Sequence, residues 1–179
     1  MAKAKERGSA YPIVFLTLVV LVSVVALTLI DGVTREKIAA AQRDEIKEML
    51  AALFPEMDDY EFDEASHNYG ILTAGQPVGR AFMARKTGYG GAVDVLVGLE
   101  TNGTLRGIRV ISQQETPGLG AKIIEPAFLN QFSGLSVDEL ALRQDGGAVD
   151  AITGATISSS TVVDAVKEAL LERLGEGGE

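Results

Sequence analysis

The sequence contains no cysteine and only one histidine, His67, among its 179 residues. Without cysteine the chain forms no disulfide and offers no thiolate ligands for an iron–sulfur cluster or a zinc site. A single imidazole also leaves little basis for a histidine metal site. Any redox chemistry of this chain therefore has to use a bound organic cofactor.

Basic residues are too few to bind a nucleic-acid backbone. The chain holds 16 lysines and arginines against 25 aspartates and glutamates, a formal net charge of −9. Affinity for a phosphate backbone depends on basic side chains that release counterions, so nucleic acid is not expected as a partner. The length leaves room for one domain of about 140 residues plus one appended element.

One long hydrophobic run, residues 11–30, carries no charge. As a helix it would extend about 30 Å, the hydrocarbon thickness of a bilayer, and we predict a transmembrane helix there. Three of the 16 basic residues precede it with one acid, and the rest of the chain is acidic. The positive-inside rule therefore places residues 1–10 in the cytoplasm and the domain outside. A cleaved signal peptide is the alternative, but "LTLIDGVTRE" offers no small-residue cleavage site.

The segment 31–64 is predicted to be a juxtamembrane helix and a linker. After a break at Asp31 and Gly32, apolar residues recur at helical spacing in "TREKIAAAQRDEIKEMLAALF". Pro55 and the acidic run 56–64 then read as a solvated link. The polar face of the helix is mixed in charge, which favours packing on its own domain over binding to lipid.

Residues 65–174 form the predicted domain, followed by a flexible tail, 175–179. Alternating apolar residues predict strands over 78–86, 92–99 and 105–112. The Asn102-Gly103 pair readily takes the positive φ angles of a tight hairpin between the last two strands. Because acidic and apolar residues at helical period follow near the C-terminus, the fold class is α+β: an antiparallel β-meander with flanking helices.

Two glycine-rich loops border this meander. "QQETPGLGAKI", residues 113–123, lets the backbone approach a ligand closely, although composition alone favours an ordinary turn. "TGYGG", residues 87–91, likewise reads more readily as a plain glycine turn than as a phosphate cradle, since it lacks the lysine of a P-loop.

The stretch "DAITGATISSSTVV" places six hydroxyl side chains between residues 153 and 161, just before the C-terminal helical pattern. One hydroxyl suffices to cap a helix, whereas a helix N-terminus with several hydroxyls is also suited to an anion. Gly154 and Ala155 leave the Thr156 hydroxyl accessible on a turn that enters a helix near Ser158. This pattern predicts a phosphate site and leaves open whether the ligand is bound reversibly or covalently.

The same motif resembles that of membrane-anchored FMN-binding subunits of bacterial redox-driven ion pumps. The resemblance spans nearly the whole chain and is strongest to the RnfG family of the Rnf ion-translocating complex, with the related flavin subunit of the sodium-pumping NADH:quinone oxidoreductase beside it. In that family FMN is attached through its phosphate to the last threonine of Asp-x-x-(Ser/Thr)-Gly-Ala-Thr, which "DAITGAT" matches. The resemblance implies that Thr156 carries a covalent FMN phosphoester.

The resemblance also implies roles for the surrounding residues. Thr153 and Ser158 or Ser159 would bind the phosphate, and Asp150 would hold the turn or orient the motif during attachment. The segments "ETPGLG" and "GYGG" look like family segments around the flavin. The cofactor-binding residues implied, besides Thr156, are Asp150, Thr153, Gly154, Ala155, Ser158, Ser159, Glu115, Thr116, Gly118, Leu119, Gly120 and Tyr89.

The function implied is electron transfer in a membrane complex that couples ferredoxin:NAD+ oxidoreduction to Na+ or H+ translocation. The partners implied are the other subunits, a flavin transferase and a bacterial or archaeal cytoplasmic membrane, with the FMN domain on its outer side; no catalytic acid or base is needed. The alternatives are an FMN subunit of a Na+-translocating quinone reductase, a free-standing extracytoplasmic flavoprotein, or an anchored non-redox module that binds a phosphate-bearing ligand.

Overall fold

The computed structural model describes residues 10–176, and within them the side chains other than those of residues 10, 11, 29–42 and 174–176. Residues 1–9 of the predicted cytoplasmic N-terminus and residues 177–179 of the predicted tail lie outside the described residues. The chain divides into two units, Met1–Ile46 and Lys47–Glu179. In the first unit the described residues belong to helix α1 (Ala10–Leu53), whose last turns belong to the second unit.

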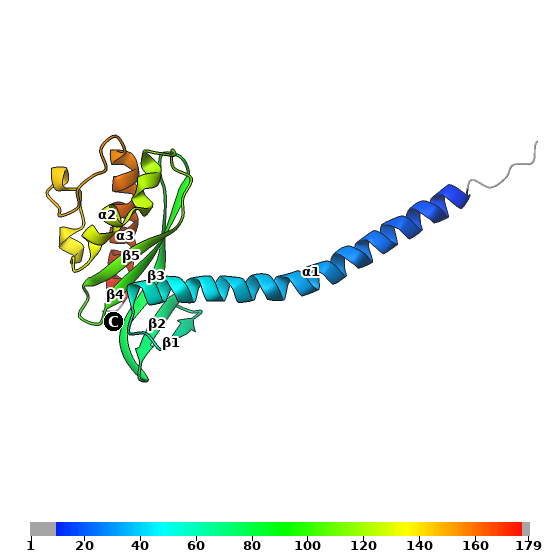
Figure 1. The fold of residues 1–179 in the computed structure, drawn as a ribbon, viewed down its shortest axis with the longest axis horizontal. Coiled ribbons are helices and arrows are strands. Elements are labelled where there is room, and N and C mark those ends of the chain that lie inside the picture. The colour runs from blue at the N-terminus through cyan, green and yellow to red at the C-terminus, as the bar shows by residue number, and fades with distance from the viewer. Residues whose placement is uncertain (1–9, 177–179) are drawn as a thin grey trace, which may run out of the picture. The chain divides into compact units, whose positions relative to one another are not determined.

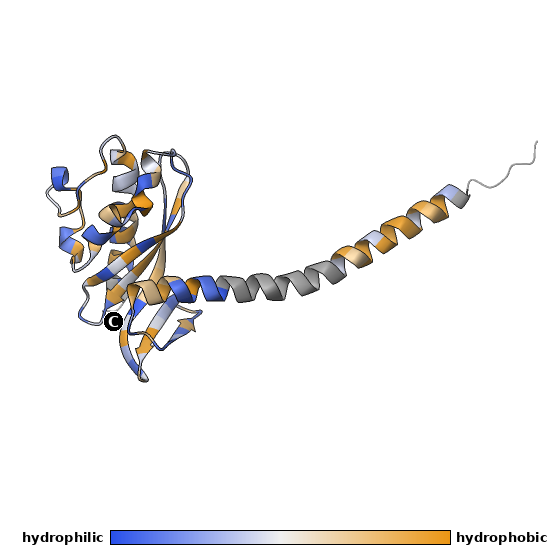
Figure 2. Cartoon of the chain, viewed as in Figure 1, coloured by the Kyte–Doolittle hydropathy of each residue, from blue (hydrophilic) through white to orange (hydrophobic). Residues whose placement is uncertain are grey.

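Helix α1 has no break at Asp31 and Gly32, where the sequence predicted one. A glycine costs about 1 kcal/mol in a helix interior, and the helix-forming stretches on both sides outweigh that cost. Side chains of residues 12–28 are exposed, and this part of the helix is the apolar stretch in Figure 2.

Within the part of the chain that the structure describes, no helix combines the length and the apolar character needed to cross a membrane.

Five strands form the antiparallel meander that the sequence predicted, and with the helices they confirm an α+β fold (Figure 1). Their order in the sheet follows the chain: β1 (Asp59–Asp63), β2 (Asn68–Thr73), β3 (Gln76–Thr87), β4 (Ala92–Glu100) and β5 (Leu105–Ser112). Alternation of apolar residues correctly located the last three strands.

Strand β1 lies within the acidic segment 56–64, which the sequence predicted to be a solvated link. Aromatic side chains explain the difference. Tyr60 and Phe62 project from the same face of β1 onto Tyr69 of β2, with ring centroids 5.9 and 4.9 Å from it. The acidic residues between them remain exposed, so the charge that indicated a linker is that of an edge strand.

The hairpin between β4 and β5 is present, but its geometry differs from the prediction. Only Gly103 takes a positive φ, +89°, while Asn102 does not. The side chain of Asn102 instead accepts a hydrogen bond at 2.9 Å from the Thr104 N–H, which closes an Asx turn within a longer loop.

Helix α3 (Thr156–Glu176) covers one face of the sheet and begins two residues before the predicted start near Ser158. Val162 and Val166 of this helix lie in one buried cluster with Phe82, Val95 and Val97 of the sheet. The helix extends to Glu176, two residues into the predicted tail. Short helical segments connect β5 to α3: η1 (Gly120–Ile124), α2 (Pro126–Leu129), η2 (Asn130–Phe132), η3 (Val137–Glu139) and η4 (Arg143–Asp145).

The opposite face of the sheet receives the end of α1. Phe54 is 1% exposed, and its ring lies against backbone at Gly79 and Gly98, where an added Cβ would approach it to 2.7 and 3.0 Å. Leu53 lies beside Gly107, at 3.3 Å from the corresponding position. We call Gly79, Gly98 and Gly107 the glycine groove. Because these residues have no side chains, the sheet surface is recessed at this point and admits a phenyl ring.

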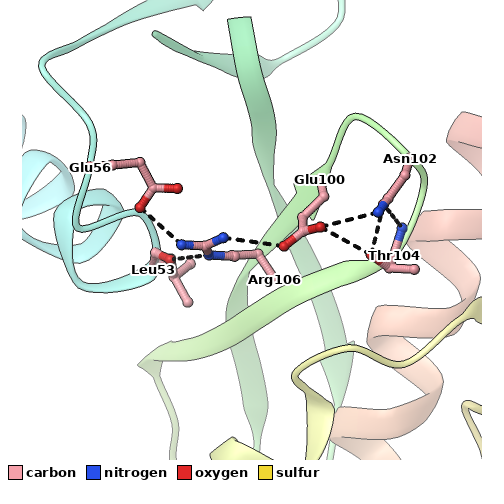
Figure 3. Close-up of polar contacts among 6 residues, drawn as sticks. All are labelled: Leu53, Glu56, Glu100, Asn102, Thr104 and Arg106. Carbon is pink, nitrogen blue, oxygen red and sulfur yellow. Dashed lines mark hydrogen bonds and ion pairs between the residues drawn. The ribbon is translucent and has the colours of Figure 1, made fainter. Parts of the chain in front are cut away.

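Arg106 secures the same junction from β5 (Figure 3). Its Nε donates a hydrogen bond at 3.2 Å to the carbonyl of Leu53, one of the last in α1. The other guanidinium nitrogens contact Glu56 at 2.9 Å and Glu100 at 3.2 Å. Its Cζ also lies 5.7 Å from the centre of the Phe54 ring. The end of α1 is therefore joined to the sheet by both apolar packing and a branched ion pair.

Candidate functional site

The turn before α3 presents Thr156 at the helix start. Gly154 has φ of +80°, a left-handed conformation that favours glycine, and the Ala155 N–H donates to the Ile152 carbonyl at 2.9 Å. Ser159 braces this turn: its hydroxyl accepts from the Ile152 N–H at 3.0 Å and donates to the Ala155 carbonyl at 2.9 Å. Thr156 is exposed, as the sequence predicted, and lies at the positive end of a 21-residue helix.

Two side chains that the sequence analysis did not single out hold the beginning of the motif. Gln131 accepts a hydrogen bond from the Asp150 N–H at 2.7 Å and donates to its carbonyl at 3.3 Å. Arg143 contacts both carboxylate oxygens of Asp150, at 2.6 and 3.1 Å. The hydrogen bond from Arg143 lowers the pKa of Asp150 below its usual value. Asp150 thus fixes the approach to the turn, although its carboxylate does not line the cleft described next.

A cleft of about 520 Å³ lies in front of this turn. Eight of the residues that the sequence predicted line it, together with Ile157, which the prediction missed. The lining consists of Tyr89, Thr116, Leu119, Gly120, Gly154, Ala155, Thr156, Ile157 and Ser158. A signal for Ile157 was present in the sequence, because it is an apolar residue that falls outside the buried face of the helix and is 57% exposed.

The other five predicted residues lie outside the cleft lining. Asp150 and Ser159 hold the turn, as described above, and Thr153 and Gly118 are exposed next to residues that do line the cleft. Glu115 is buried behind the wall. Its Oε2 accepts a hydrogen bond from the Ser158 hydroxyl at 2.9 Å, so Ser158 makes an internal contact as well as lining the cleft.

Both glycine loops contribute walls, and the structure shows why they contain glycine. A Cβ at Gly90 would lie 2.1 Å from the Gln114 carbonyl oxygen, so only glycine lets the turn between β3 and β4 approach the end of β5 so closely. The turn itself is closed by the Gly88 N–H, which donates to the Gly91 carbonyl at 2.7 Å. This packing brings residues 88–91 beside residues 113–120, two segments that the sequence separates by a hairpin.

The residues present fit a flavin nucleotide. Tyr89, Leu119 and Ile157 are exposed apolar or aromatic side chains, 73%, 46% and 57% accessible, that offer area to a planar ring. Gly154 and Gly120 keep Cβ atoms out of the cleft, where one at Gly154 would lie 3.3 Å from the Leu119 Cδ2. The first N–H groups of α3 and the Thr156 hydroxyl provide donors for a phosphate. The volume is in the usual range for cofactor sites.

Known proteins support the same interpretation. The FMN-binding domain family matches residues 88–171. The RnfG protein of the ion-translocating oxidoreductase complex of Methanosarcina acetivorans is 34% identical over 171 residues, which cover 88% of this chain and 91% of that protein. The corresponding protein of Stutzerimonas stutzeri is 32% identical, over 93% of this chain and 81% of that protein. The chain belongs to the RnfG family of ion-translocating oxidoreductase complexes.

Two solved structures share the fold of this RnfG-family chain. The NqrC protein of the Na+-translocating NADH-quinone reductase of Parabacteroides distasonis superposes with a TM-score of 0.54 at 24% identity, over 64% of this chain and 65% of that one. NqrC of Shewanella oneidensis gives 0.50 at 18% identity, over 68% and 70%. The matched FMN-binding domain begins at Gly88 and contains every residue that the sequence predicted for the site.

Proposed function

We propose that this chain is the FMN-carrying electron-transfer subunit of an ion-translocating oxidoreductase complex, with FMN joined to Thr156 by a phosphoester. The observation that carries the proposal is the position of Thr156, exposed at the start of α3 and lining a cleft with three accessible apolar side chains. FMN supplies the electron-accepting and electron-donating chemistry when bound. The chain itself binds and orients the group, and no side chain has to transfer a proton.

Ester formation requires an activated FMN donor and, in this proposal, a flavin transferase. The Thr156 Oγ1 displaces a leaving group from the phosphorus of the donor, the hydroxyl proton is released, and the leaving group departs with the bonding electron pair. Helix α3 favours the product, because its positive end lies beside the phosphate charge that the ester retains. Gly154 and Ala155 keep side-chain bulk away from the attacking oxygen.

Fluorescence of the denatured chain tests the covalent bond. The full chain, made in a host that contains the transferase, is expected to fluoresce on a denaturing gel, and Thr156→Ala is expected to abolish the signal. Ser160→Ala is the matched control, because Ser160 lies one turn further on and its hydroxyl donates to the Ile157 carbonyl at 2.9 Å. A dark wild-type band, or a fluorescent Thr156→Ala band, would show that the phosphoester is not where we place it.

We assign the reaction of the whole complex as ferredoxin:NAD+ oxidoreduction coupled to Na+ or H+ movement. The sequence relatives, named as parts of an ion-translocating oxidoreductase complex and matched over most of their length, support this assignment over a quinone-reductase subunit, whose resemblance is in the fold. A single apolar helix cannot form an ion pathway, so translocation would belong to other subunits. A purified complex that reduces NAD+ with ferredoxin, and quinone not at all, would agree; the reverse preference would favour the alternative.

We also propose that residues 11–30 anchor the chain in the cytoplasmic membrane, with the FMN domain on the outer side. The run is uncharged, and within it the hydroxyls of Thr17 and Thr28 donate to carbonyls one turn earlier, at 2.9 and 2.8 Å, which gives both threonine hydroxyl hydrogens a partner. Protease added outside spheroplasts is expected to remove the domain. A domain that is cut only after permeabilisation would reverse the topology.

A further inference from the structure

Glu115 is an acidic residue buried directly behind the cleft. It is 5% exposed, and its carboxylate lies between the glycine turn of residues 88–91 and the first turn of α3. Oε2 accepts from the Ser158 hydroxyl at 2.9 Å and from the Gly90 N–H at 3.3 Å. Oε1 is buried, and among the residues that the structure describes it has no hydrogen-bond partner. A carboxyl oxygen left in this way is costly, so the site is retained against a loss of stability.

Two glycines make room for this carboxylate. A Cβ at Gly88 would lie 2.1 Å from Oε1, and one at Gly120 would lie 2.8 Å from Oε2 and 2.5 Å from the Ser158 Oγ. A side chain at either position would displace the carboxyl group. The glutamate, the two glycines and Ser158 therefore form one unit that links the three segments around the cleft.

The hydroxyl of Ser158 has a single hydrogen, which this geometry directs at Glu115. It is therefore committed to the wall of the cleft while the contact lasts. The phosphate of a flavin would then depend on the N–H groups at the start of α3 and on Thr156, and not on donation from Ser158. The same contact holds the helix start at a fixed position relative to residues 113–120.

We infer that Glu115 is a positioning residue whose buried carboxylate also lowers the midpoint potential of the attached flavin. The inference rests on the proposed FMN site. Electrons added to a flavin bring negative charge into the cleft, and a fixed negative charge in the adjoining low-dielectric wall disfavours that addition. Ser158 acts through Glu115, by holding the carboxylate against the cleft wall.

Two variants separate charge from position, each compared with the wild-type full chain carrying flavin. Glu115→Gln removes the charge and keeps an oxygen for Ser158 and Gly90, so the midpoint potential in a spectroelectrochemical titration is expected to become more positive. Ser158→Ala keeps the charge and removes one contact, so it is expected to lower the melting temperature of the flavin-free chain with a smaller effect on the potential. Glu125→Gln, at an exposed carboxylate, is the control and is expected to leave the potential unchanged.

The inference is overturned if Glu115→Gln carries flavin with the wild-type potential, or if Glu125→Gln shifts the potential as much. A Glu115→Gln chain that fails to fold or to take up flavin also overturns it, because removing a negative charge beside a phosphate should not hinder attachment. These results differ from failure of the proposed function itself, in which the wild-type chain shows no fluorescence after denaturation.

Discussion

Replacing Phe54 with alanine is expected to destabilise the second unit by about 3–5 kcal/mol, the usual range for removing a buried phenyl ring. The side chain is 1% exposed and lies in the glycine groove, on the face of the sheet opposite α3. The floor of this groove at Gly79 and Gly98 is backbone, which does not collapse into the vacated space as a flexible side chain would. The cavity therefore stays largely open, and the loss falls in the range for a rigid site.

Gly98→Ala tests the same contact from the other side. Its Cβ would lie 3.0 Å from the Phe54 Cε2, so overpacking is expected to cost about 1–3 kcal/mol. Gly98 does not have a positive φ, and backbone strain does not add to this cost. In the double variant the new methyl group enters the space that the ring has left. The combined loss should therefore be smaller than the sum of the single losses by about 1–3 kcal/mol.

Denaturant unfolding of the full chain in detergent, followed by tyrosine fluorescence, gives the four free energies of this cycle. Gly70→Ala is the matched control, since it is also a strand glycine without a positive φ but its Cβ would meet nothing closer than the Glu61 carbonyl oxygen at 3.8 Å. Combined with Phe54→Ala it should add within about 0.5 kcal/mol. Losses that add equally well for Phe54 and Gly98 would refute the proposed packing.

Three further substitutions test the motif and its surroundings. Gly154→Ala forces a left-handed φ of +80° on a residue with a Cβ, which costs about 1–2 kcal/mol, and the fraction of chains fluorescent on a denaturing gel should fall; full labelling would contradict this. Arg143→Ala should return the pKa of Asp150 to its usual range, which an NMR titration of the carboxyl group measures, with little loss of stability because both side chains are exposed. Glu139 accepts hydrogen bonds from Ser136 that lower its pKa, so its stabilisation is present above the usual value of about 4.3 and is lost as the pH falls through the folded value; melting temperatures of Glu139→Gln should vary less across that acid range, and an unchanged pH dependence would contradict the assignment.

The attachment motif was readable from the sequence because its information is local. A glycine, an alanine and a threonine before a helical pattern imply a left-handed turn and an exposed hydroxyl, and Gly154 and Thr156 have those properties in the structure. Hydroxyl count alone was less informative, because neighbouring side chains with the same chemistry serve different purposes. Ser159 holds the turn and Ser158 contacts Glu115, and both depend on which way the helix face points.

Strand β1 and the glycine groove required the tertiary structure. Acidic composition indicated a linker, since charge is a local property, whereas the reason for a strand lies in Tyr69 on the neighbouring strand. Likewise, nothing near Gly79 or Gly98 in the sequence indicates that a phenyl ring from the end of a helix fills the space above them.

The sequence by itself determined the chemistry available to this protein: no thiolate or imidazole cluster, one apolar run, a meander, and a threonine on a turn suited to a flavin phosphate. These follow from residue type and from spacing along the chain, which a single sequence displays. The tertiary structure decided how that threonine is surrounded. Tyr89, Leu119 and Thr156 come from three separate segments, and Glu115 joins them from behind. Contacts between distant segments depend on how the sheet and the helix pack, and spacing along the chain does not record that packing.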